Sequence, residues 1–329
     1  MTHKRRMTVK FPSLTRRLGM TLAIAVTSGL ALTACGGGGA DTADGPTRPV
    51  KHAMGETRVP EHPKRVVVLD QDKLDSLYTL GITPVGAALP DQASGMPKYL
   101  GPEFAKVKSV GTLQQPDLEA IAALKPDLIL GSKFRQEKFY AELAKIAPTV
   151  FTERVGITWK ENFQLDAEAV GKKDEGRQKL QQYEAQAKQL GRRLGDPAAL
   201  KISLIRFRPD EIRQYGPESF AGIVLNDIGL GRPKAQLLEG KDDRRFAPIS
   251  TERIDQVDGD FIFVSAFGQK AAEQMSTVTA GPLWKKLGAV KDGRVKVVDD
   301  EIWMTGIGVT AAGKILNDIR TYVTPLAKA

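Results

Sequence analysis

Three arginines and a tyrosine lie close together in the stretch ISLIRFRPDEIRQYG (202–216). Side chains alternate between the two faces of a strand, so Arg206 and Arg208 share one face where this strand should end. A guanidinium removed from water costs several kcal/mol unless it finds an acceptor. The cationic group comprises Arg206, Arg208 and Arg213, with Tyr215 beside them. Its acceptors are either the carboxylates of Asp210, Glu211 and Asp227 or the oxygens of a bound ligand.

Aromatic residues at the ends of predicted strands are candidates for contact with an organic ligand. Trp303 lies in EIWMTGIG, just after an apolar strand and beside two glycines. Its ring either stacks on a ligand or covers the core of its own half of the chain. Phe134 and Phe267 also follow apolar strands and are weaker candidates of the same kind.

The residue inventory gives little support for catalysis or for a resident metal. The three histidines are His3, His52 and His62, so the core has no histidine to act as a base or a ligand. The sequence has no G-x-S-x-G motif and no phosphate-binding loop. We therefore expect no enzyme activity, no catalytic residue, no metal site and no cofactor.

The N-terminal segment resembles a bacterial lipoprotein signal. Six basic residues precede an apolar run that ends in Leu-Thr-Ala-Cys35. This lipobox resemblance implies a signal peptide over 1–34, a lipid anchor on Cys35 and a place on the extracytoplasmic face of the cell membrane. Residues 35–55 are then expected to form a flexible tether that begins with four glycines. The alternatives are an ordinary secretory signal with a stray cysteine, or a membrane helix.

The charge of the remaining chain argues against nucleic acid as a partner. The whole chain has 48 basic and 39 acidic residues, but six of the basic ones belong to the signal. The body is therefore nearly balanced, which gives no electrostatic case for binding nucleic acid.

Strands and helices alternate along the body, which predicts an α/β fold. KRVVVLD (64–70) is an apolar run typical of a strand buried on both faces, and a helix with Asp72 as its N-cap should follow. Apolar residues spaced by three and four predict one long helix over 174–195. We assign an N-terminal lobe to 56–158, a linking helix region to 159–195 and a C-terminal lobe to 196–329.

The chain resembles a known family of solute-binding proteins over residues 56–325. The stretches PKRVVVLDQDKLDSLYTLGITPVGAA, LEAIAALKPDLIL and PLWKKLGAVKDGRVKVVDDEIW look like iron-siderophore (FecB/FhuD-like) substrate-binding lipoproteins of ABC importers. The resemblance implies two three-layer α/β lobes, one long backbone helix joining them and a ligand cleft between the lobes. It also implies a monomer that delivers a ferric siderophore to a permease, docking through one glutamate on each lobe, Glu119 and Glu252.

The same resemblance gives roles to the candidate residues. Arg206, Arg208 and Arg213 would donate to the oxygens bound to iron, and the aromatic set Tyr215, Phe220 and Trp303 favours a hydroxamate chelate. Two alternatives are a haem- or corrinoid-binding protein of the same fold and a surface lipoprotein without a transport role.

Overall fold

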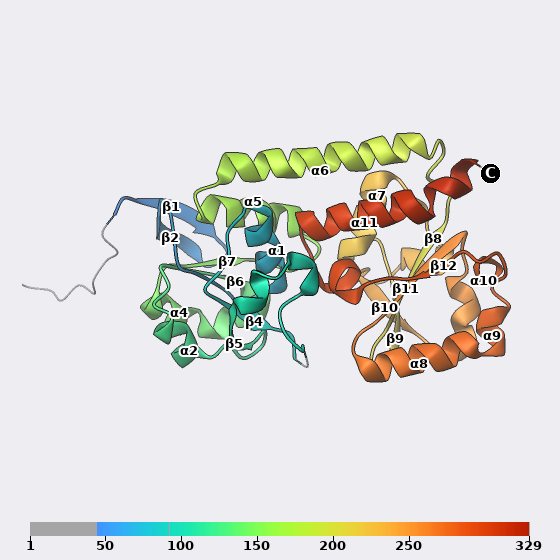
Figure 1. Cartoon of the computed structure of the whole chain (residues 1–329), viewed down its shortest axis with the longest axis horizontal. Coiled ribbons are helices and arrows are strands. Elements are labelled where there is room, and N and C mark those ends of the chain that lie inside the picture. Colours follow the sequence, from blue (N-terminus) through green and yellow to red (C-terminus); the bar gives the residue numbers. More distant parts are fainter. Residues whose placement is uncertain (1–44, 92, 329) are drawn as a thin grey trace, which may run out of the picture. The chain divides into compact units, whose positions relative to one another are not determined.

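Five parallel strands form the sheet of the N-terminal lobe in a computed structural model that describes residues 45–91 and 93–328 (Figure 1). The strand order is β5-β4-β3-β6-β7. Both faces are covered, because alternate residues of β3 pack in two separate hydrophobic cores. The strands are β3 (Val66–Val68), β4 (Gly86–Leu89), β5 (Lys108–Thr112), β6 (Leu128–Ser132) and β7 (Thr149–Thr152). The helices are α1 (Gln71–Thr79), α2 (Leu118–Ala123), α3 (Lys133–Gln136), α4 (Tyr140–Ile146) and α5 (Trp159–Ala169), with short helices η1 (Lys98–Leu100), η2 (Phe104–Lys106) and η3 (Glu137–Phe139).

The C-terminal lobe also has a five-stranded sheet, in the order β10-β9-β8-β11-β12, with β9 antiparallel to its neighbours. Its inner face packs against α7 and α11, and α8 covers its outer face. The strands are β8 (Ile202–Phe207), β9 (Ile212–Tyr215), β10 (Phe246–Ile249), β11 (Phe261–Ala266) and β12 (Val295–Val297). The helices are α7 (Phe220–Ile228), α8 (Gln269–Ala280), α9 (Pro282–Lys285), α10 (Gly288–Lys291) and α11 (Val309–Tyr322), with short helices η4 (Lys234–Leu237), η5 (Thr251–Val257), η6 (Glu301–Thr305) and η7 (Thr324–Lys328).

One long helix, α6 (Lys173–Arg193), joins the lobes and packs on both, which confirms the predicted architecture (Figure 1). Its apolar positions are buried at the spacing expected from the sequence. Two glycines of α6, one near each end, let a neighbouring helix come close to its backbone. A Cβ on Gly176 would meet the Ala167 side chain at 2.4 Å, and one on Gly191 would meet the Ile228 carbonyl at 2.1 Å. The helix therefore contacts α5 in one lobe and α7 in the other.

Part of the segment predicted to be a tether is ordered. β1 (Thr47–His52) pairs with β2 (Gly55–Pro60) in an antiparallel hairpin, and Gly55, which follows the turn, has a φ of 117°. Val50 and Val59 are buried in the N-terminal core. The tether expectation is therefore wrong for residues 47–55, because each strand of the hairpin buries one valine in the core of the lobe. The predicted signal peptide and Cys35 lie outside the described residues.

The N-cap of α1 is Asp70 rather than the predicted Asp72. The Asp70 carboxylate accepts a hydrogen bond from the Gln71 amide at 2.9 Å, and Asp70 itself has extended backbone angles. Asp72 is instead buried in the first turn, where it contacts the Lys73 ammonium group at 3.1 Å. Both aspartates suit an N-terminal turn, so composition alone did not separate them.

Candidate functional site

Arg206, Arg208 and Arg213 lie on the inner face of the C-terminal sheet, and we call these three residues the arginine face. Arg206 of β8 and Arg213 of β9 are directly opposite in the antiparallel register. Strand alternation places Arg206 with Ile202 and Leu204, which pack in the inner core. The sheet therefore brings three guanidiniums to one surface, whereas the spacing in the sequence predicted a shared face for Arg206 and Arg208 only.

Arg206 is only 5% exposed and is held by an internal carboxylate. Its Nε and Nη2 donate to the two oxygens of Asp300 at 2.7 and 2.6 Å, and Nη1 donates to the Tyr215 hydroxyl at 3.3 Å. The Ser265 hydroxyl donates to the same Asp300 carboxylate at 2.9 Å. Arg206 thus has an internal partner, and that partner is none of the three carboxylates considered from the sequence.

Arg208 differs from Arg206 in having no acceptor in the part of the chain that the structure describes. Among the described residues its guanidinium forms no hydrogen bond or ion pair, and it lies 5.6 Å from the centroid of the Phe267 ring. Partial burial lowers the pKa of the Arg208 side chain, and the like charges of Arg206 and Arg213 lower that pKa further. This crowding of positive charge is relieved by an anion, so Arg208 is the member of the arginine face best placed to bind one.

Arg213 is paired but remains partly exposed. Its Nε donates to the Glu211 carboxylate at 2.5 Å, and its guanidinium lies 3.9 Å from the centroid of the Phe246 ring. Arg245 lies over the same Phe246 ring at 5.8 Å, while Phe267 is within 5.0 Å of Arg206. Aromatic rings therefore separate the guanidiniums and support them through cation–π contacts.

A pocket of about 330 Å³ between the lobes lies next to Arg245. The N-terminal lobe contributes Phe134 and Arg154, and the C-terminal lobe contributes Arg245 together with acidic residues. Phe134 is 59% exposed, which is unusual for a phenylalanine and leaves its ring available to a ligand. The complete lining is Phe134, Arg154, Val155, Ile157, Glu218, Asp242, Asp243 and Arg245.

The sequence reasoning did not identify Arg154, Arg245 or Phe246. Arg154 could have been found, because it follows β7 at the carboxyl end of a parallel strand, where ligands bind in open α/β sheets. Phe246 is the first residue of β10 and Arg245 directly precedes it. β10 pairs with the antiparallel strand β9, and the rule for parallel strands does not apply there.

Trp303 and Phe220 lie in the core, which corrects their assignment as ligand contacts. Trp303 is 0% exposed, its indole N–H donates to the Asp318 carboxylate at 2.8 Å, and its ring stacks on Phe263. Phe220 is 4% exposed and packs edge-on against Trp159. The glycine-flanked sequence around Trp303 forms part of η6, which turns the indole inward. Tyr215, also buried, contacts Arg206 rather than open space.

Glu119 and Glu252 occupy equivalent places in the two lobes. Glu119 is exposed in the first turn of α2, where the Asp117 side chain caps the helix. Glu252 is exposed in the first turn of η5 and accepts a hydrogen bond from Thr251 at 3.2 Å. Neither carboxylate belongs to the arginine face or to the pocket between the lobes, so both are free to meet a partner on another surface.

A buried carboxylate, Asp75 of α1, links the two lobes beside α6. It accepts hydrogen bonds from the Thr310 and Ala311 amides at 2.9 Å, and so holds the N-terminus of α11. The Tyr99 hydroxyl donates to Asp75 at 2.9 Å and to the Gly306 carbonyl at 3.3 Å. Burial raises the pKa of Asp75 to about 6 in spite of these donors.

This raised pKa predicts an unusual dependence of stability on pH. The folded protein binds the Asp75 proton more tightly than the unfolded chain, whose carboxyl has a pKa of 3.8. The group therefore contributes about 2–3 kcal/mol of stability below the unfolded pKa, and this is lost as the pH rises through the folded pKa. In urea denaturation at a series of pH values, Asp75→Asn should lose less stability than the wild type as the pH rises. Asp174→Asn, at an exposed position, is the control. If the free energy of unfolding depends on pH in the same way for Asp75→Asn and the wild type, the raised pKa of Asp75 is contradicted.

The described residues contain no helix with the length and apolar character needed to cross a membrane. They also contain no cluster of three or more histidine, cysteine, aspartate or glutamate side chains with the geometry to hold a metal ion.

Two lobes joined by one long helix, with an arginine face on the C-terminal sheet, form the arrangement that the sequence predicted for a solute-binding protein. The profile of the family described as "Periplasmic binding protein" matches residues 66–302, and the chain belongs to this family. It is 41% identical over 284 residues to the probable siderophore-binding lipoprotein YfiY of Bacillus subtilis, covering 84% of this chain and 87% of YfiY. It is 30% identical to the Fe(3+) dicitrate-binding periplasmic protein FecB of Escherichia coli, covering 82% and 90% of the two chains. The structure of Staphylococcus aureus SirA complexed with staphyloferrin B is similar, with a TM-score of 0.73, 34% identity and coverage of 84% and 98%.

Proposed function

We propose that this protein is an extracytoplasmic receptor that binds a ferric siderophore and delivers it to an ABC importer. The observation that carries the proposal is the arginine face, where three guanidiniums meet and Arg208 has no acceptor within the described residues. A chelate of iron presents several anionic or polarised oxygens on one compact body, which suits such a surface. The names of YfiY, FecB and the SirA complex support the same class of ligand.

Within that class, we propose an anionic chelate of the carboxylate type in place of the hydroxamate expected from the sequence. The hydroxamate expectation rested on Tyr215, Phe220 and Trp303, and all three are buried. Charged donors remain, because Arg208 has no acceptor among the described residues and Arg154 lines the pocket between the lobes, whereas Arg245 of the same pocket is already paired with Asp243. FecB, whose name gives Fe(3+) dicitrate as its ligand, supports this proposal further.

Fluorescence titration of the mature chain tests both the receptor function and the class of chelate that is bound. The probes are ferric and iron-free forms of citrate, a citrate-based siderophore, a tris-hydroxamate and a tris-catecholate. We expect the ferric citrate-based chelate to quench tryptophan emission at the lowest concentration. Tighter binding of the tris-hydroxamate would overturn the assignment to carboxylate chelates. A flat response to all ferric chelates would overturn the receptor function.

Arg208→Ala should weaken binding of the preferred ferric chelate by a factor of about 10 to 150, the value of one charge-assisted hydrogen bond of about 1.5–3 kcal/mol. The fold should be little affected, because the Arg208 guanidinium has no partner to lose among the described residues. Titration of Arg208→Ala, with Arg192→Ala on the exposed surface of α6 as the matched control, measures the effect. Unchanged affinity would place the chelate away from the arginine face.

Lipid attachment at Cys35 is the proposed anchor. Cys35→Ala should release the protein from the membrane and leave chelate affinity unchanged, because the binding residues all lie within 134–300 of the chain. Cell fractionation followed by titration of the released protein checks both parts. Retention of the variant in the membrane fraction after signal cleavage would contradict anchoring through this thiol.

A further inference from the structure

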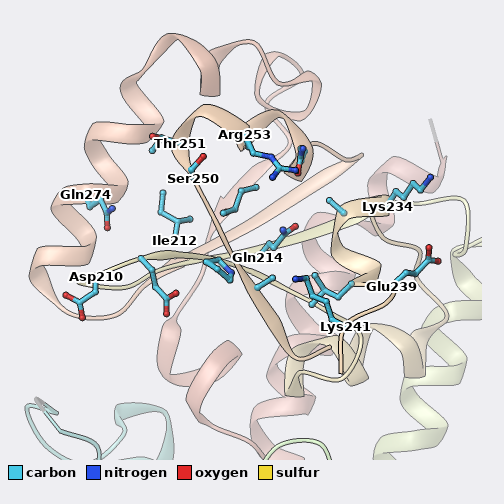
Figure 2. Close-up of a pocket in the computed structure, with 17 residues that line it drawn as sticks. Asp210, Ile212, Gln214, Lys234, Glu239, Lys241, Ser250, Thr251, Arg253 and Gln274 are labelled. Atoms are coloured by element: carbon cyan, nitrogen blue, oxygen red, sulfur yellow. The ribbon is translucent and has the colours of Figure 1, made fainter. Parts of the chain in front are cut away.

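A cavity of about 930 Å³ lies on the outer face of the C-terminal sheet, opposite the arginine face (Figure 2). Its floor includes Ile212 and Ile249, which belong to the outer core of the lobe. Residues of η4, η5 and α8 form its walls. None of the three residues of the arginine face lines it, so the sheet separates this cavity from the proposed chelate site.

The floor of the cavity is apolar except for one amide. Ile212, Leu238 and Ile249 are buried there, and Gln214 lies among them with only 7% of its surface exposed. The Gln214 Oε1 atom has no hydrogen-bond partner among the described residues, and the same is true of Oε1 of Gln274 on the wall. Buried amide oxygens are normally satisfied, so these two favour an occupant that brings N–H donors.

The rim of the cavity carries opposite charges at its two ends. Figure 2 shows Asp210 and Gln274 on one side of Gln214, and Lys234 and Lys241 on the other. Glu239 lies beside the two lysines and offsets part of their charge. The carboxylate of Glu211, which also lines the cavity, is already held by Arg213 on the other face. A molecule with a positive and a negative end fits this arrangement.

We propose that the outer cavity is a second binding site, which takes a short peptide with free termini. The ammonium group of the peptide lies at Asp210, and its carboxylate lies at Lys234 and Lys241. A main-chain N–H of the peptide donates a hydrogen bond to Oε1 of Gln214. An apolar side chain packs on Leu238 and the isoleucines of the floor. The volume is in the range of small-molecule sites, which is about 300–1,000 Å³.

Isothermal titration calorimetry with the tripeptide Ala-Leu-Ala tests the proposal on the mature chain. We expect saturable binding that becomes at least about tenfold weaker when the amino terminus is acetylated or the carboxyl terminus is amidated, since each change removes one charge-assisted contact. No saturable binding, or equal binding of the capped and free peptides, would overturn the proposal.

Two variants locate the binding. Ala235 lines the cavity and is only partly exposed, so Ala235→Phe should fill it and abolish tripeptide binding. Ala272→Phe on the exposed surface of α8 is the matched control, and circular dichroism confirms that both variants fold. Unchanged binding to Ala235→Phe would overturn the site. Loss of tripeptide binding in Arg208→Ala would place the peptide in the chelate site and would also overturn it.

Discussion

Uptake of the ferric chelate into cells is expected to stop when Glu119 and Glu252 are both replaced by alanine, while chelate affinity in solution stays the same. The two carboxylates are exposed, lie one on each lobe and stand apart from the arginine face. The resemblance described in the sequence analysis implies that one surface glutamate on each lobe meets an arginine of the permease. Charges at the rim of an interface act mainly on docking, so removing both should uncouple the receptor from its importer.

The measurement is uptake of radioactive iron as the chelate by cells that produce the variant at wild-type level. The matched control is the pair Glu142→Ala and Glu273→Ala, which removes one exposed helical glutamate from each lobe. The simpler explanation for Glu119 and Glu252 is that a carboxylate in a first turn interacts favourably with the helix dipole. Normal uptake by the Glu119→Ala, Glu252→Ala variant would leave only that explanation.

The features predicted well from the sequence depend on local periodicity. Helix α6 was expected over 174–195 and spans 173–193, because its apolar residues are spaced by three and four and its end is marked by glycine and proline. The strand predicted here was expected to place Arg206 and Arg208 on one face, because side chains alternate along a strand. Strand β8 contains Arg206 and ends at Phe207, one residue before Arg208. Patterns of this kind need no knowledge of the rest of the fold.

The features missed depend on contacts between distant parts of the chain. Asp300, the partner of Arg206, is 94 residues away and reaches it only because β12 lies in the same sheet as β8. The burial of Trp303 likewise depends on Asp318 and Phe263, which offer its indole a hydrogen-bond acceptor and a stacking surface. A tryptophan next to glycines has the same local sequence whether its ring faces solvent or the core. The structure therefore decided which aromatic residues remain candidates, and Phe134 is the one it leaves exposed at the pocket between the lobes.

Arg206→Ala is expected to lower the free energy of unfolding by about 3–5 kcal/mol, the cost of removing one partner from a buried ion pair. Among the described residues, the substitution leaves the Asp300 carboxylate, whose side chain is 12% exposed, with only the Ser265 hydroxyl as a donor. Asp300→Ala should cost a similar amount, because the Tyr215 hydroxyl is then the one hydrogen-bond acceptor that the described part of the chain gives the Arg206 guanidinium.

Urea denaturation of the two single variants and of the Arg206→Leu, Asp300→Leu double variant separates an ion pair from a ligand contact. If the two groups chiefly stabilise each other, the double variant loses much less than the sum of the single losses, because no buried charge is left unpaired. Arg208→Ala, whose guanidinium has no partner among the described residues, should by contrast change affinity and not stability. Full stability of Arg206→Ala together with lost chelate affinity would reverse these roles and make Arg206 a direct ligand of the chelate.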